Sequence, residues 1–327
     1  MTTGELEVGG AGSLGIAFET TAGTYEAPDK WIPIRSETLL DASVPIYRMN
    51  IVGTANRNGV IPGYKLANGD FVFEVTADVM PYLLMAARMT VVRTGLVAPF
   101  TYTATPTSIA KSTTAAPATP ADPVTCTNKT LSVLIQRSKI PMAYLGCSVG
   151  HLAFTIDAGV LLCTVSLVGF GEETESTETP SYADSVPFGP GKLLLESPTG
   201  TSRPDVDTFS FEINDNGTPQ NRLTGSRFAA YNSWGEREVS GSFEHDFENT
   251  DDFDAFMAGD ISTIHFTATN TADDSIDIVV AQKVLDSYPV HLSGLGNLVV
   301  AQTTYHGLGD ASNDDYTITV VTNEDVT

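Results

Sequence analysis

The chain has few cations. Lysine and arginine together account for 17 of its 327 residues, against 40 aspartates and glutamates, so the net charge at pH 7 is −23. A protein that grips nucleic acid needs cations to contact phosphates, so this composition argues against that class of partner. The same acidity favours solubility and also fits a protein that works in very high salt.

Cysteine and export signals are scarce as well. Cys126, Cys147 and Cys163 are odd in number and have no CxxC spacing, which favours buried thiols over a disulfide framework. The N-terminal residues MTTGELEVGG lack the basic and apolar regions of a secretory signal. The most apolar stretch, His151 to Phe170, contains a turn at Asp157-Ala158-Gly159 and predicts a β-hairpin, so we expect no membrane partner.

Signatures of catalysis and ligand binding are missing too. The G-x-G-x-x-G match at Gly10–Gly15 has no apolar strand before it and no helix after it, which a dinucleotide site requires. The five histidines show no ligand spacing, and Asp251, Asp252 and Asp254 lie where a helix N-terminus favours anions. We therefore predict no catalytic residue, no cofactor and no metal site.

What the sequence does contain is a strand that runs into a short helix. Val239, Gly241, Phe243, His245 and Phe247 alternate with Ser240, Ser242, Glu244 and Asp246. This period of two predicts a strand with one buried face, on which His245 is a hydrogen-bonded core histidine. Asn249–Asp252 offers a helix cap, Phe253–Met257 has helical spacing, and Gly259 ends the helix.

The same construction occurs earlier in the chain. Gly69–Val75 predicts a strand, Thr76–Asp78 a cap and Met80–Met89 a helix. Gly53 and Gly225 lie 172 residues apart, as do Gly69 and Gly241, which indicates an internal repeat.

Further along, the separation between the two copies shrinks. Leu161–Val165 aligns best with Leu298–Gln302, at an offset of 137, so the first copy carries about 35 additional residues. The Thr-, Ala- and Pro-rich run Ala98–Asp122 lies within this excess, and we interpret it as an inserted loop that builds no core of its own.

These patterns predict a mainly β protein with one short helix in each copy. We expect an exposed N-terminal arm over residues 1–25, a first domain over 26–171 with its insertion at about 98–125, a linker over 172–205 and a second domain over 206–327.

Three stretches of this sequence resemble a known family. They are Gly15–Thr24 with Trp31–Glu37, then Phe71–Thr76 running into Asp78–Ala86, and finally Phe209–Asn216, Leu223–Arg227 and Val239–Met257. In pattern and order they resemble the major tail tube proteins of siphovirus-type tailed viruses, of phages or archaea. The fold of that family is shared with the ring protein of the type VI secretion apparatus.

The resemblance implies two tandem tail-tube-type β-sandwich or barrel domains, each with one flanking helix. Such domains form six-membered rings whose inner sheets join into one barrel, and the rings stack through an N-terminal arm and loops. It also implies a structural virion protein rather than an enzyme, assembled in the host cytoplasm with tape-measure, terminator and distal tail proteins. Viral DNA would pass through the tube into the host without specific binding.

The sequence adds two expectations. A chain with two copies would close a ring with three chains, which predicts a homotrimer with pseudo-sixfold symmetry. The candidate lumen-facing acidic residues are Asp70, Glu74, Glu238, Glu244 and Asp246. They would repel DNA phosphates from the wall of a channel, or they would form an ordinary solvated outer face.

Two other functions compete with the structural one. A virion-surface binding module could recognise a host glycan through stacking on Trp31 and Trp234. An acidic, salt-adapted enzyme could assemble a site from scattered carboxylates. The internal repeat and the missing motifs favour the tube subunit, and rings or tubes in electron micrographs would distinguish it from both.

Overall fold

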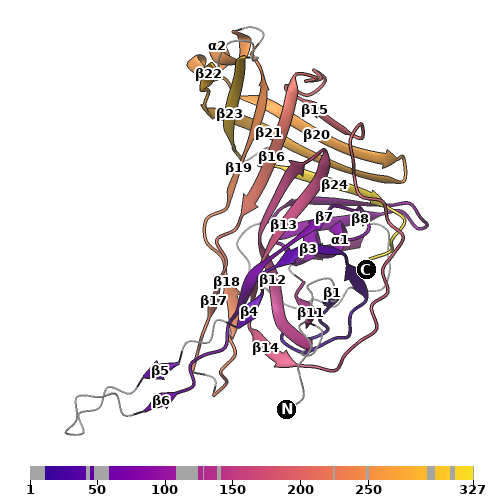
Figure 1. The fold of residues 1–327 in the computed structure, drawn as a ribbon, viewed down its shortest axis with the longest axis vertical. Helices are drawn as coiled ribbons and strands as arrows, with labels where there is room; N and C mark the ends of the chain where they lie inside the picture. Colours follow the sequence, from indigo (N-terminus) through magenta and orange to yellow (C-terminus); the bar gives the residue numbers. More distant parts are fainter. Residues whose placement is uncertain are drawn as a thin grey trace, which may run out of the picture.

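The computed structural model describes residues 12–41, 45–47, 59–107, 124–127, 129–137, 141–223, 225–247, 250–292, 299–309 and 314–326. The described chain is mainly β, as predicted, with two short helices (Figure 1). Its strands form one antiparallel main sheet, two outer groups of strands and two small hairpins.

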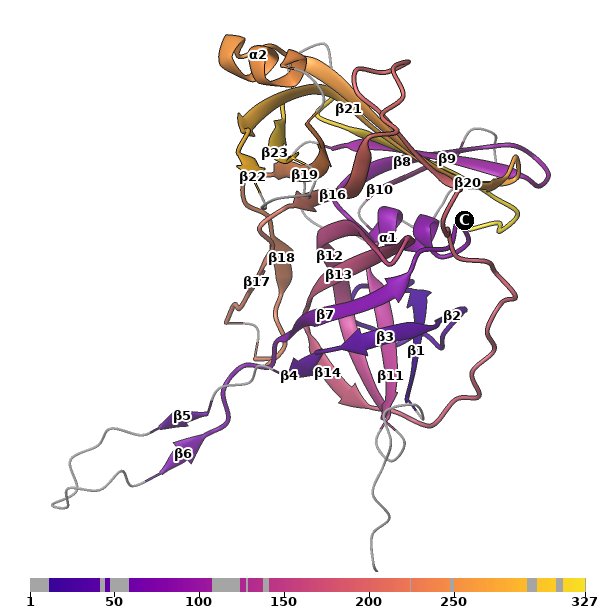
Figure 2. The same ribbon diagram turned by 45° about the horizontal axis from the view of Figure 1, so that its top comes forward.

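The main sheet runs through the middle of the molecule (Figures 1 and 2). In spatial order its strands are β3 (Ile34–Glu37) and β4 (Leu40–Asp41), β7 (Ala67–Glu74), β13 (Val160–Gly169), β12 (Pro141–Asp157), β16 (Val206–Asn214), β19 (Glu238–Asp246) and β23 (Val299–Gly307). Beyond β23 lie the second half of β21 (Asp274–Ser287) and β22 (Val290–Leu292). The pairing of β12 with β16 therefore joins the two halves of the chain into one sheet.

The outer groups begin where the two longest strands leave the main sheet. The first half of β12 pairs with β14 (Gly171–Thr174) and with β11 (Leu131–Arg137), which continues to β1 (Gly12–Phe18) and β2 (Lys30–Ile32). The first half of β21 pairs with β20 (Ser262–Thr271), and β20 pairs with β15 (Leu193–Glu196). The other edge of this first half of β21 pairs with β24 (Thr317–Thr322). Beyond β24 lie, in order, β9 (Phe100–Pro106), β8 (Met89–Thr94) and β10 (Val124–Thr127).

Each half also carries a small hairpin that projects from one end of the main sheet (Figure 2). The first consists of β5 (Ile46–Tyr47) and β6 (Val60–Ile61), and the second of β17 (Thr218–Gln220) and β18 (Tyr231–Ser233). The helices α1 (Met80–Ala86) and α2 (Asp251–Ala258) follow β7 and β19, at the opposite end of those strands.

The alternation predicted for β19 is confirmed. Val239, Phe243 and His245 are buried, while Ser240 and Glu244 on the other face are partly exposed. His245 is 3% exposed and lies within 3.3 Å of the Tyr288 hydroxyl, so it is a hydrogen-bonded core histidine as expected. One apolar core extends along this face through both halves of the chain.

The predicted hairpin within His151–Phe170 is confirmed as the pairing of β12 with β13. Its turn places Ala158 and Gly159 at φ values of 50° and 79°, the backbone shape that suits a tight β-hairpin. In the described part of the chain, no helix is long and apolar enough to cross a membrane.

The helices depart from prediction at their ends. α1 stops at Ala86 because Met89 and Val91 are buried at a spacing of two and begin β8. No side chain caps α1, and the expected cap residue Asp78 instead pairs with Lys30 at 2.7 Å. α2 also lacks a side-chain cap, whereas its predicted end at Gly259 is confirmed by a left-handed φ of 68°.

Two segments expected outside the core contribute to it. Gly12–Phe18 was placed in an exposed arm, but it forms the buried strand β1 between β11 and β2. The insertion was expected to build no core, yet its first part, Phe100–Pro106, forms β9. Phe100, Tyr102 and Ala104 are buried on one side of β9, because their spacing of two suits a strand that pairs on both edges. Residues 108–123 of the insertion lie outside the described residues.

The strand registers repeat along the chain. The pairs Glu37↔Phe71 and Leu40↔Asn68 recur, 172 residues later, as Phe209↔Phe243 and Glu212↔Ser240. A register shift falls between Ile34 and Ser36 and again, after the same interval, between Val206 and Thr208.

The offset of 137 expected for the closing strands is wrong by one residue. Cys163 pairs with Phe73, and Ala301 pairs with His245, which is 172 residues beyond Phe73. Cys163 therefore matches Ala301, at an offset of 138. An alignment of short apolar runs misses this difference, because only strand pairing fixes which residues face the core.

We predict that Gly241→Ala destabilises the fold. A Cβ at this position would lie 2.3 Å from the Ser210 carbonyl oxygen and 2.4 Å from the hydroxyl of the buried Tyr305. Overpacking of this kind costs about 1–3 kcal/mol of unfolding free energy, measurable by denaturant titration. Ser240→Ala, on the solvent side of the same strand, is the control and should change stability by no more than about 0.5 kcal/mol. Equal midpoints for the two variants would contradict the prediction.

Candidate functional site

The face of the main sheet that points away from the core is the candidate functional site, and we call it the polar face. Its described residues include Asn68, Asp70, Val72 and Glu74 of β7, Leu162, Thr164, Ser166 and Val168 of β13, His151, Ala153, Thr155 and Asp157 of β12, Thr208, Ser210, Glu212 and Asn214 of β16, Glu238, Ser240, Ser242, Glu244 and Asp246 of β19, and Val300, Gln302, Thr304 and His306 of β23. Seven of them are aspartate or glutamate, and none is lysine or arginine.

Cross-strand pairing makes this face continuous. Asp70 pairs with Ser166, Ser166 with His151, His151 with Asn214, and Asn214 with Glu238. Paired residues in a sheet point to the same side, so this row crosses five strands on one surface. The structure thus brings Asp70, Glu74, Glu238, Glu244 and Asp246 together on one face, with the first two on β7 and the other three on β19.

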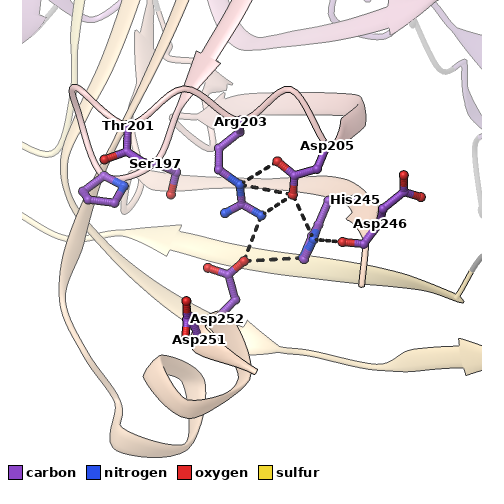
Figure 3. Close-up of a pocket in the computed structure, with 9 residues that line it drawn as sticks. Ser197, Thr201, Arg203, Asp205, His245, Asp246, Asp251 and Asp252 are labelled. Carbon is purple, nitrogen blue, oxygen red and sulfur yellow. Dashed lines mark hydrogen bonds and ion pairs between the residues drawn. The ribbon is translucent and has the colours of Figure 1, made fainter. Parts of the chain in front are cut away.

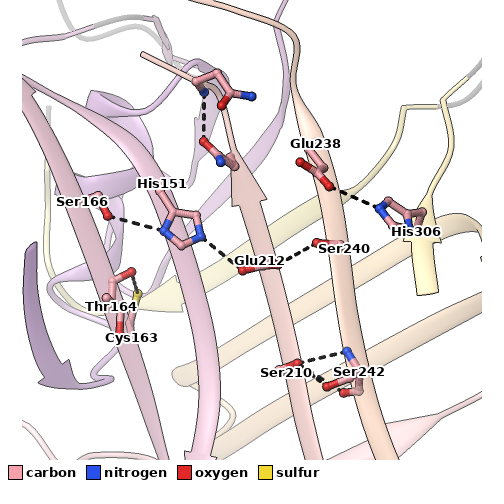
Figure 4. A network of polar contacts seen from close by, with 12 residues as sticks. His151, Cys163, Thr164, Ser166, Ser210, Glu212, Glu238, Ser240, Ser242 and His306 are labelled. Carbon is pink, nitrogen blue, oxygen red and sulfur yellow. Dashed lines mark hydrogen bonds and ion pairs between the residues drawn. The ribbon is translucent and has the colours of Figure 1, made fainter. Parts of the chain in front are cut away.

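Small polar side chains separate these carboxylates (Figure 4). Ser240 donates a hydrogen bond of 2.8 Å to Glu212, and the hydroxyls of Ser210 and Ser242 lie 2.8 Å apart. The ring of His151 lies 3.4 Å from both Glu212 and Ser166. The face is therefore hydrophilic and has few long side chains.

A single arginine reaches onto this face from β3. The Arg35 guanidinium lies 2.7 Å from Asp157 and 3.1 Å from Glu74, and these hydrogen bonds raise its pKa above the ordinary value. Because Arg35 is matched by two carboxylates, the polar face keeps a net negative charge.

His306 is one titratable group on this face whose protonation would change that charge. It contacts Asp286 of β21 and lies 3.3 Å from Glu238 (Figure 4 shows the contact with Glu238). Partial burial lowers the pKa of His306, but the hydrogen bonds to the two carboxylates outweigh that effect, and the net shift is upward.

Asp157, Glu212 and Asp286 were missed when the candidate residues were chosen from the sequence. Glu212 had a detectable signal, because it occupies the polar position between Phe211 and Ile213 in a strand with a period of two. Asp157 and Asp286 lie at a hairpin turn and at a register shift, where alternation gives no guide to direction.

The described structure does not form the other sites that the sequence left open. Trp31 is buried at 5% exposure and the ring of Trp234 packs against Gly217, so the two do not form an open stacking platform. Cys147 and Cys163 are buried free thiols, and burial raises the pKa of both. Within the described ranges, no group of three or more His, Cys, Asp or Glu could hold a metal ion.

Comparison with protein families places almost the whole chain in one family. A family model described as phage tail tube protein matches residues 9–313, which is nearly the whole chain. A search of curated proteins finds no match.

We predict that His306 stabilises the fold only at acidic pH. Because its pKa in the folded protein is raised above 6.5, its contribution is fully present below that pH and is lost as pH rises through the folded-state value. For this half-exposed pair the effect is at most about 0.5–1 kcal/mol. The difference in unfolding free energy between wild type and His306→Gln should thus be larger at pH 5.5 than at pH 8.5.

The control for this measurement is Gln302→Ala on the same strand and face, which removes no titratable group. Its difference from wild type should not depend on pH. A pH-independent effect of His306→Gln would contradict the assignment.

Proposed function

The chain belongs to the phage tail tube protein family, and we propose that it closes into three-membered rings that stack as the conduit for viral DNA. Membership makes it a structural component of the virion tail. The ring proposal rests on one observation: among the described residues, the strand at each end of the main sheet is paired along one edge only.

The junction inside the chain provides the template. β12 and β16 come from different halves of the chain, and they pair from His151↔Asn214 to Thr155↔Ser210. Under the 172-residue repeat, β16 corresponds to β3 and β4. In the second copy, the counterpart of β12 is the second half of β21 together with β22. Phe154 of β12 pairs with Cys163, and Val290 of β22 pairs with Ala301, which corresponds to Cys163.

The counterparts of β16 and β12 are the two outermost strands of the main sheet. Within the described part of the chain, the outer edge of each lacks a partner. β3 and β4 pair only with β7, and the segment from Val284 to Leu292 pairs only with β23. An open strand edge exposes unpaired N–H and C=O groups and invites another strand. Joining the last edge of one chain to the first edge of the next would repeat the β12–β16 junction.

This joint is heterologous, so copies add head to tail until the ring closes. With two repeats per chain, three chains give six repeats and pseudo-sixfold symmetry. The matching registers support reading residues 26–171 and 206–327 as two tandem tube domains connected through 172–205. Residues 172–205 contain most of β14 and all of β15, and both strands belong to the outer groups.

In such a ring the polar face is the lumen wall. The main sheet has its core on one side and carboxylates with small hydroxyls on the other. A wall of this kind repels phosphates and gives DNA few cations to bind during transit. The tape-measure, terminator and distal tail proteins are the expected partners at the tube's interior and ends.

The register of the joint is testable by disulfide trapping. Ala153 pairs with Glu212 inside the chain, so Pro289 should pair with Leu40 of the neighbouring chain. Both positions are exposed, and directly paired residues have the Cα separation that a disulfide requires. Oxidised P289C/L40C should give covalent dimers and trimers in denaturing gels.

A ladder that ends at three chains supports a trimeric ring, and one that continues to six contradicts it. Wild-type protein, with its native cysteines, is the control for other cross-links. Absence of cross-linking in rings seen by electron microscopy would contradict the predicted register.

The lumen assignment predicts the effect of reversing charge on the polar face. Tubes of D70K/E244K should bind short duplex DNA at low ionic strength, because the wall gains cations. Tubes of D184K/D273K, which has the same change in net charge at exposed positions off the main sheet, should not. Cosedimentation of labelled DNA measures both, and equal binding would place the polar face outside the lumen.

A further inference from the structure

A polar cavity of about 290 Å³ lies beside the first turn of α2 (Figure 3). Its walls come from the loop after β15, the end of β19 and the start of α2. Of the side chains that line it, the proposed ring uses only Asp246 of the polar face. The chemistry of the remaining side chains therefore needs a separate explanation.

Ser197, in the wall of this cavity, contacts a buried lysine. The Lys283 amine lies 2.7 Å from the Ser197 hydroxyl. Lys283 is 2% exposed and Ser197 is 6% exposed. The two residues are 86 positions apart in the chain, so no local sequence motif indicates the pair.

Strand pairing holds both residues in place. Ser197 directly follows β15, which pairs with one edge of β20. Lys283 lies opposite Ser262 on the other edge of β20 and opposite Gly307 of β23, where β21 passes from the outer group into the main sheet. The Ser197 N–H also donates a hydrogen bond of 3.0 Å to the Thr201 carbonyl. The hydroxyl is therefore positioned before any ligand binds.

The surroundings of Lys283 disfavour its charged form. Its amine lies 5.0 Å from the centre of the Phe243 ring and donates to a neutral hydroxyl. Burial lowers the pKa of Lys283 to about 8, and the neighbouring Arg203 adds to this shift while Asp252 opposes it. A large share of the amine is thus neutral in mildly alkaline solution and can accept a proton from the hydroxyl.

We propose that Ser197 is a nucleophile, activated by Lys283, that accepts an acyl group from a small ester in this cavity. The Ser197 oxygen bonds to the ester carbonyl carbon, its proton passes to the Lys283 amine, and the bond to the leaving alkoxide breaks as the alkoxide takes that proton. Water then attacks the acyl-serine, the same amine carries its proton to the Ser197 oxygen, and the carboxylic acid leaves. A serine beside a lysine base is an established type of nucleophilic pair.

Arg203 places a positive charge on the wall of the same cavity (Figure 3). Its guanidinium lies 2.8 Å from both Asp205 and Asp252, and the buried His245 lies beside the two carboxylates, at 3.4 and 3.7 Å. This ionic cluster also anchors α2, because Asp252 belongs to its first turn. A guanidinium fixed in this way can stabilise the charge that develops on the ester carbonyl oxygen.

The charges around the cavity define the class of ester. Asp205, Asp246, Asp251 and Asp252 line it, against the single arginine. This excess of carboxylates repels an anionic ester and attracts a cationic one. We therefore expect neutral or cationic esters to react and carboxylated ones to react poorly.

The test uses a neutral fluorophosphonate ester, which forms a bond to an activated serine oxygen and releases fluoride. Peptide mapping of labelled wild-type protein should place the adduct on Ser197. The labelling rate should rise with pH and reach half of its plateau near pH 8, because the neutral Lys283 amine is the base. K283M removes that base and should lower the rate about 100-fold or more.

Two variants are matched controls. S202A removes an exposed serine of the same loop, and K192M removes an exposed lysine just before β15. Both should label Ser197 at the wild-type rate, whereas S197A should carry no adduct at this position. K283M should keep the fold, since an apolar side chain of similar length replaces a buried amine. A thermal melt checks this.

Each outcome decides a stated point. Wild-type protein without an adduct on Ser197, or K283M that labels as fast as wild type, would overturn the proposal. If K283M does not fold, the wild-type pH profile decides instead, and a rate without an inflection near pH 8 would overturn it. Equal rates for probes with trimethylammonium and carboxylate tails would overturn the charge preference. Labelling does not require the ring, so a negative result leaves the proposed function standing.

Discussion

Backbone hydrogen bonding at the edges of the main sheet is the constraint on which this structure depends. Inside the chain, β12 and β16 satisfy each other and join the two halves. The strands at the two ends of the sheet, β3 with β4 and β21 with β22, have no such partner among the described residues. An open edge exposes unpaired N–H and C=O groups that invite another strand, and in the proposed ring the neighbouring chain would supply it.

The distribution of charge follows the same logic. Carboxylates and hydroxyls occupy the solvent side of the sheet, where Arg35 is held by Glu74 and Asp157. Between Ala42 and Gly69 the sequence contains Arg48, Arg57 and Lys65 but no aspartate or glutamate. A uniformly acidic surface would repel its own copies, so local basic segments give a strongly acidic protein a way to associate.

Alternation in the sequence was enough to predict the mainly β class, the buried side of β19, the β12–β13 hairpin and the polar sides of β7 and β19. It failed where tertiary pairing decides the outcome. β1 lies in a Gly- and Thr-rich segment and β9 in a Thr-, Ala- and Pro-rich one, and neither composition predicts a core strand. They become strands through their pairing with β11 and β24. The one-residue error at Cys163 has the same origin, since register is set between strands.

The two helices show what repetition leaves undetermined. Both follow a strand of the main sheet after intervals that differ by one residue. Yet α1 is wholly buried, while α2 rests on the ionic cluster around Arg203 and leaves Met257 exposed. A repeat fixes the position of an element, whereas the chain packed around it decides whether its surface is core. In a ring built from such pairs, the uncovered helix recurs at every second position. In the proposed ring of three chains, a contact that uses this helix would therefore repeat three times around the ring rather than six.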